Sequence, residues 1–162
     1  MDSTSAPTQD VIGIAIVCPD CRLPGRAART FMAAAPEVEK VHPGPSVFSP
    51  EQTLNDDEGL QGVLYQLRKV FRLYPGRHLR IGVFGHRDCK ANPISESQRH
   101  GEIVRAAGRL YLALATERVD FVGTIEIAGY HQDFDENGKF VPDRIVQLTS
   151  HMPIVIEATS VA

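Results

Sequence analysis

Hydrophobic residues occur in short, nearly continuous runs that are rich in β-branched side chains. The first two runs are VIGIAIVC at 11–18 and LRIGVFG at 79–85. Such runs are typical of strands that are covered on both faces of a parallel sheet. We predict buried strands there, a third over 119–129 and a fourth over 144–148. The apolar segment 153–158 is expected to pair at the sheet edge or with a partner chain.

Two helices are predicted between these strands by apolar residues that recur with a helical period. The first has its apolar face over 60–74 and is ended by Pro75 and Gly76. The second has its apolar side over 103–114. Ser95 and Gln98 have the spacing of a capping box at its start.

The alternation of strands and helices predicts a single α/β domain with a mostly parallel central sheet flanked by helices. The chain has 162 residues, which fits one domain. We expect residues 1–10 to be a flexible N-terminal tail and residues 11–162 to form the domain. The proline- and glycine-rich segment 42–50 is expected to be a loop, and DENG at 135–138 a tight turn.

Charge and hydropathy narrow the partners and the compartment. The net charge of -3, from 17 basic and 20 acidic residues, disfavours a nucleic-acid partner. No apolar run reaches the roughly 18 residues of a membrane span. The polar N-terminus has neither a basic start nor an apolar stretch, so no secretory signal is expected. We therefore expect a cytoplasmic protein whose thiols stay reduced.

Two clusters of reactive side chains follow the first two predicted strands. CPDCR occupies 18–22 and HRDC occupies 86–89. Because ligands bind at the carboxyl ends of strands in open α/β sheets, we expect both clusters at one edge. Thiolates and imidazole are good zinc ligands, which makes Cys18, His86 and Cys89 candidate ligands of Zn²⁺.

The role of Cys21 separates three kinds of site. As a fourth ligand it would close a structural zinc site. If the chain instead stays extended after the strand, Cys18, Asp20 and Arg22 share one side and Cys21 points away, which leaves an open, catalytic zinc. The third reading is a Cys-x-x-Cys redox site, which needs a helix N-terminus at its first cysteine. Pro24 and the glycine after it place the start of any helix later, which disfavours this reading.

The order Cys-x-Asp-x-Arg after a first strand and Gly-His-x-x-Cys after a later one resembles the β-class carbonic anhydrases. The resemblance implies Cys18, His86 and Cys89 as zinc ligands. It also implies Asp20 as the carboxylate of a catalytic dyad and Arg22 as its partner. The implied assembly is a homodimer or a higher homo-oligomer.

The activity implied by the resemblance is reversible hydration of CO2 to bicarbonate by a zinc-bound hydroxide. Asp20 would accept the hydroxide's proton in a hydrogen bond, and Arg22 would hold Asp20 ionised. Alternatives on the same site are hydrolysis of CS2 or COS and a non-catalytic zinc protein closed by Cys21 or Asp20. His42, His100 and His131 are candidates for carrying the proton to solvent, although each one taken alone is better explained as a surface histidine without a task.

Overall fold

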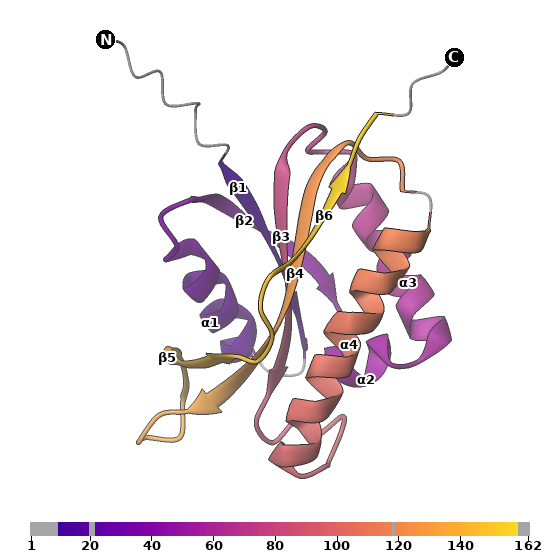
Figure 1. Ribbon diagram of the computed structural model, residues 1–162. Helices are drawn as coiled ribbons and strands as arrows, with labels where there is room; N and C mark the ends of the chain where they lie inside the picture. The colour runs from indigo at the N-terminus through magenta and orange to yellow at the C-terminus, as the bar shows by residue number, and fades with distance from the viewer. Residues whose placement is uncertain (1–9, 20–21, 118, 159–162) are drawn as a thin grey trace.

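The computed structural model describes residues 10–19, 22–117 and 119–158. The described residues form six strands and four helices (Figure 1). The strands are β1 (Val11–Val17), β2 (Val38–Ser46), β3 (His78–His86), β4 (Gly123–Phe134), β5 (Phe140–Gln147) and β6 (Met152–Ile156). The helices are α1 (Arg22–Ala33), α2 (Pro50–Leu54), α3 (Asp57–Phe71) and α4 (Glu96–Thr116). The expected tail lies outside the described residues except for Asp10.

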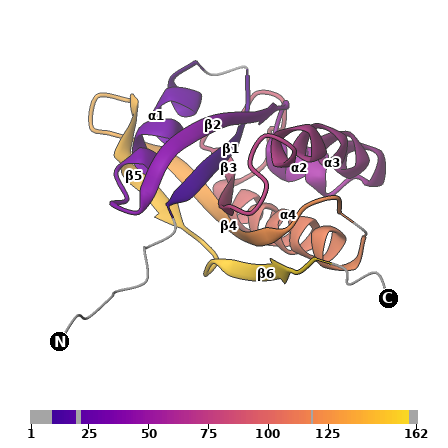
Figure 2. The same cartoon turned by 90° about the horizontal axis from the view of Figure 1, so that it is seen from above.

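The strands form one mixed sheet in the order β2-β1-β3-β4-β5. Strands β2, β1, β3 and β4 run parallel. The outer edge of β4 is shared, because β5 pairs antiparallel with its C-terminal half and β6 with its N-terminal half. Helix α1 covers one face of the sheet and α2, α3 and α4 cover the other (Figure 2). The predicted single α/β domain with a mostly parallel sheet is confirmed.

Both faces of the central strands are buried, which explains the continuous apolar runs. Along β1, Ile12, Ile14 and Ile16 belong to the core beneath α3 and α4. The alternate residues Ala15 and Val17 belong to a smaller core beneath α1. This period of two is the geometry of an extended strand. A strand covered in this way has no polar face to interrupt its pattern.

Helix α3 confirms the predicted helix and its apolar face. The residues of that face that lie within the helix are all buried: Leu60, Val63, Leu64, Leu67, Val70 and Phe71. Tyr74 lies beyond the helix end and is half-buried. The helix starts earlier than its apolar face, where the Asp56 side chain accepts a hydrogen bond from Gly59 N at 2.8 Å. The negative charge of this cap also interacts favourably with the positive end of the helix dipole.

The predicted capping box of α4 is present. Gln98 N donates to Ser95 Oγ at 3.1 Å, and Ser95 N donates to Gln98 Oε1 at 3.1 Å. We expect Ser95→Ala to lower the free energy of unfolding by about 1 kcal/mol, because the backbone N–H of Gln98 loses its acceptor, the Ser95 hydroxyl. Urea unfolding of Ser97→Ala, an exposed position in the same first turn, is the matched control and should change by less than about 0.5 kcal/mol. Equal losses in both variants would contradict the cap.

The loop predicted over 42–50 is wrong for its first half, because β2 continues to Ser46. Proline is tolerated there because β2 is an edge strand of the sheet and one side of it carries no ladder. Gly44 lies so close to β1 that a Cβ on it would be 2.7 Å from Ala15 O. The prolines and the glycine of β2 are therefore explained by its irregular edge position and by the close approach of its backbone to β1.

Two other boundaries differ from the prediction. The strand expected over 119–129 is β4, which starts at Gly123 and continues to Phe134. Pro19 lies in a turn and helix α1 already starts at Arg22, so neither residue is extended as predicted. Pro24 is accommodated because the first turn of a helix has no internal acceptor for its N–H groups. The expectation that any helix would start after Pro24 is therefore also wrong.

The C-terminal elements follow the prediction. The segment 135–138 is a tight turn in which Asp135 Oδ1 accepts hydrogen bonds from the backbone N–H of Asn137 and Lys139 at 2.8 and 2.9 Å. Strand β5 contains the predicted strand 144–148 except its last residue. Strand β6 pairs at the sheet edge within the chain. None of the helices in the described ranges combines the length and the apolar character that crossing a membrane requires.

Candidate metal centre

Cys18, His86 and Cys89 come together as predicted. One potential ligand atom from each lies within 4.8 Å of the other two, and all three residues are buried. The two Sγ atoms are 4.0 Å apart. Tetrahedral zinc with Zn–S bonds of about 2.3 Å separates two sulfurs by about 3.8 Å. The spacing of the thiols therefore fits a shared metal ion such as zinc.

The sheet topology creates this cluster from distant parts of the chain. Cys18 directly follows β1, and His86 is the last residue of β3. Since β1 and β3 are parallel neighbours, their carboxyl ends lie at one edge. Asp88 then adopts a φ of 54°, in the left-handed region. This turn brings Cys89 back beneath the strand end within three residues, where its carbonyl accepts from Asn92 N at 3.1 Å.

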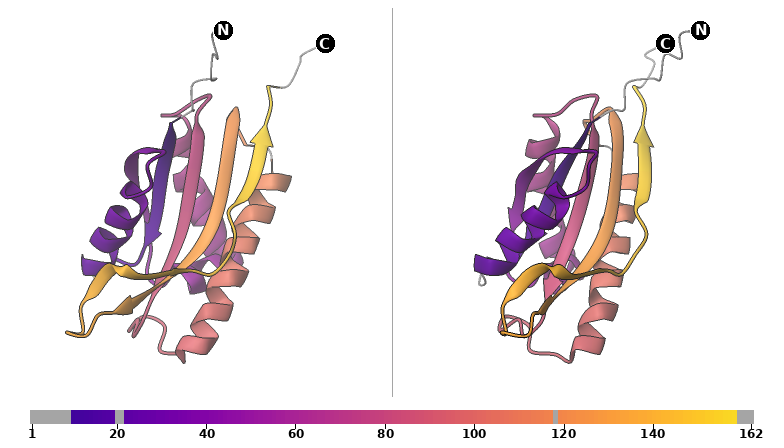
Figure 3. Two further views of the ribbon diagram at one scale, coloured as in Figure 1. Left: turned by 60° about the vertical axis from the view of Figure 1, so that its left-hand side comes forward. Right: turned by 90° about the vertical axis from the view of Figure 1, so that its left-hand side faces the viewer.

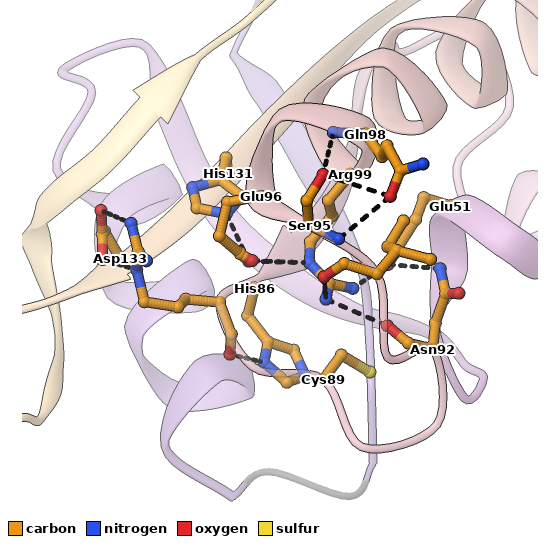
Figure 4. Close-up of polar contacts among 12 residues, drawn as sticks. Glu51, His86, Cys89, Asn92, Ser95, Glu96, Gln98, Arg99, His131 and Asp133 are labelled. Carbon is orange, nitrogen blue, oxygen red and sulfur yellow. Dashed lines mark hydrogen bonds and ion pairs between the residues drawn. The ribbon is translucent and has the colours of Figure 1, made fainter.

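The orientation of His86 suits a metal ligand. Its Nδ1 is 2.9 Å from the Arg87 carbonyl oxygen, so the neutral ring donates there and leaves the lone pair on Nε2. The Phe140 ring packs edge-on against the imidazole, with the ring centres 5.4 Å apart. A carbonyl on the distal ring nitrogen is the usual support of a histidine that binds a metal. Figure 4 shows this contact and the neighbouring Cys89.

The electrostatics of the cluster favour a cation. The facing Cys18 side chain, together with burial, raises the pKa of Cys89 far above that of a free thiol. Burial alone would lower the pKa of His86, but Cys18 and the Arg87 carbonyl outweigh it and the pKa is raised. Two thiolates this close repel each other in a buried site. A divalent ion removes that repulsion, and its binding must release thiol protons.

The structure does not describe the side chains of the other predicted site residues. Asp20 and Cys21 lie outside the described residues. The backbone of Arg22 begins α1, and nothing is described of its side chain. The Asp20–Arg22 dyad and the role of Cys21 therefore stay predictions. The prediction that the chain is still extended at Arg22 is wrong, because this residue is helical.

Sequence reasoning missed a buried ion-pair network beside the triad, which is drawn in Figure 4. The guanidinium of Arg99 donates to Glu51 Oε1 at 2.9 Å and to Glu96 Oε1 at 2.9 Å. It also donates to the Asn92 carbonyl at 3.0 Å. The Asn92 amide in turn donates to Glu102 Oε2 at 2.9 Å. Only the three-dimensional fold brings α2, the turn after β3 and α4 together, so no local motif marks this network.

The histidines proposed as proton carriers lie in different surroundings. His131 on β4 is buried, 3.5 Å from Glu96 Oε1, and its ring centre is 4.3 Å from that of the half-buried His100. These two histidines therefore extend the Arg99 network toward the surface. His42 lies in β2 with its ring against Tyr74. It belongs to another part of the sheet.

The loss of unfolding free energy at acidic pH should depend on His131. Burial, followed by the charge of His100, lowers the pKa of His131. Below about pH 6.5 the unfolded chain therefore binds a proton that the folded chain binds less readily, so stability falls as pH falls. We expect His131→Gln to remove up to about 1 kcal/mol of the loss of unfolding free energy between pH 6.5 and 5.5. Urea titrations at both values measure this, with His42→Gln as the control; an unchanged loss in His131→Gln would contradict it.

Comparison with models of known protein families and with curated proteins finds no match to this chain. The structure itself shows a buried Cys-His-Cys triad and the mostly parallel α/β sheet that positions it.

Proposed function

We propose that the chain is a zinc enzyme that catalyses the reversible hydration of CO2 to bicarbonate. The observation that carries this proposal is the buried set of two thiols and one imidazole at the carboxyl edge of parallel strands. Three protein ligands leave one position of a tetrahedral ion open, as in catalytic zinc sites. Zinc bound there would lower the pKa of a water molecule to about 7 and so supply hydroxide at neutral pH.

The residues of the chain would divide the remaining work. Cys18 and Cys89, as thiolates, would neutralise the ion, and the Arg87 carbonyl would hold His86 in the tautomer that offers Nε2. By the resemblance to the carbonic anhydrases, a carboxylate oxygen of Asp20 would accept a hydrogen bond from the hydroxide at the open position. Arg22 would keep that carboxylate ionised and in place. CS2 or COS hydrolysis is the alternative that uses the same groups.

Zinc analysis and stopped-flow CO2 hydration test the proposal. We expect about one zinc per chain and hydration above the buffer rate at pH 7 and at pH 9. If the protein contains no zinc after purification and cannot bind it, the hypotheses of a zinc enzyme and of a structural zinc site are both rejected. A zinc-loaded protein that never exceeds buffer would reject CO2 hydration and direct the assay to CS2 and COS.

The Cys21→Ser variant separates an open site from a closed one. If the zinc has an open position, this variant should keep its zinc and its hydration rate. Loss of zinc in Cys21→Ser would instead identify Cys21 as a fourth ligand and the site as structural.

A further inference from the structure

Glu51 is a charged side chain with no contact to solvent. It lies in α2, and its side chain is only 1% exposed, as is that of its partner Arg99. Burying such a charge costs free energy of folding unless it is paired and fully hydrogen-bonded. Only one carboxylate oxygen has hydrogen-bond partners: Oε1 accepts from Arg99 at 2.9 Å and faces the Asn92 amide at 3.4 Å.

The second oxygen of Glu51 lies beside the end of β3, the strand that carries His86. Oε2 is buried and has no hydrogen-bond partner in the part of the chain that the structure describes. It packs against Gly85, where a Cβ would lie 3.2 Å away, directly before the ligand His86. The other oxygen of Glu51 faces the amide of Asn92, three residues after the ligand Cys89. Glu51 is nevertheless not part of the group of atoms that could share one ion.

The ion pair with Arg99 does not cancel this negative charge. Arg99 binds two carboxylates at once, those of Glu51 and Glu96. Two negative charges on one guanidinium leave a net charge of about -1 next to the triad. Because the side chains of Glu51 and Arg99 are buried, this charge is poorly screened. An anion bound among the three ligands would therefore be repelled, whereas a neutral ligand would not.

We propose that Glu51 is a specificity-determining residue of the metal centre, whose unpaired oxygen and charge favour a neutral ligand over an anion there. This inference rests on the proposed function. In CO2 hydration the substrate is neutral and the product is an anion, so the charge of Glu51 would aid entry of the one and release of the other. Glu51 acts on the bound ligand without binding the metal.

Azide binding to Co²⁺-loaded protein, followed by the visible spectrum of the ion, tests this role without any assay of turnover. We expect Glu51→Gln to bind one Co²⁺ per chain and to bind azide about tenfold more tightly than the wild type, because one negative charge is gone. The variant should fold, since Arg99 keeps Glu96 and the Asn92 carbonyl as acceptors. Glu136→Gln is the control, because it makes the same change at a carboxylate that is 88% exposed and lies outside the Arg99 network; its azide affinity should change less than about threefold.

Each outcome bears on one claim. Unchanged azide affinity in Glu51→Gln would make Glu51 merely structural, and loss of Co²⁺ would make it a ligand; either result overturns the inference. If Glu51→Gln does not fold, Glu51→Asp, which keeps the charge, must bind azide as weakly as the wild type, and tight binding would overturn the inference. A wild type that binds no Co²⁺ would reject the proposed function itself.

Discussion

Cys89→Ser should lose nearly all of its zinc during purification. Structural zinc sites with four ligands bind with about 10–16 kcal/mol, so one thiolate contributes about 3 kcal/mol and its loss weakens binding more than a hundredfold. A serine hydroxyl does not replace it, because its pKa is too high for it to bind as an anion at neutral pH. The zinc content per chain, measured after dialysis against a weak chelator, should fall from about one to less than about a tenth.

Lys90→Ser is the matched control for this loss. Lys90 follows Cys89 in the same turn and is exposed. It should keep its zinc, because it contributes no atom to the triad. If Cys89→Ser keeps one tightly bound zinc as well, the ion binds elsewhere and the site described above is not the metal centre.

Arg99→Met should be among the most damaging substitutions for stability. It leaves the buried carboxylate of Glu51 and the Asn92 carbonyl without their donor. Removing one partner of a buried ion pair costs about 3–5 kcal/mol, because the remaining charge stays buried and uncompensated. The free energy of unfolding in urea, measured with the zinc-free protein, should fall by that amount.

The surface pair between Arg144 and Glu136 provides the control for burial. Its side chains are 43% and 88% exposed. Arg144→Met removes the same kind of contact from solvent-accessible positions and should cost less than about 1 kcal/mol. Similar losses in the two variants would show that the Arg99 network is as weak as a surface pair.

Much of the fold was predictable because its pattern is local. The buried strands β1 and β3 and the apolar face of α3 are written in short-range periodicity. The capping box at Ser95 needs only two residues three positions apart. Strand β2 was not predicted, since the tolerance for its prolines depends on its position at the sheet edge.

The residues of the candidate site also differ in whether the sequence alone could predict them. Cys18, His86 and Cys89 could be predicted to meet because they follow parallel strands, and parallel strands end at one edge. Glu51 and Arg99 could not, since a buried charge is recognised only once its surroundings are known. Their chain positions are 48 residues apart. Only the packing of α2 against α4 makes them neighbours.

The two edges of the sheet are formed differently. On one side, β5 and β6 cover β4 along most of its length, so that their own outer sides form the edge (Figure 3). On β2 the outer side is protected by composition, because Pro43 and Pro45 have no amide hydrogen to offer to a strand from another molecule. The irregular proline-rich stretch that obscures β2 in the sequence thus makes it a poor template for intermolecular β-pairing.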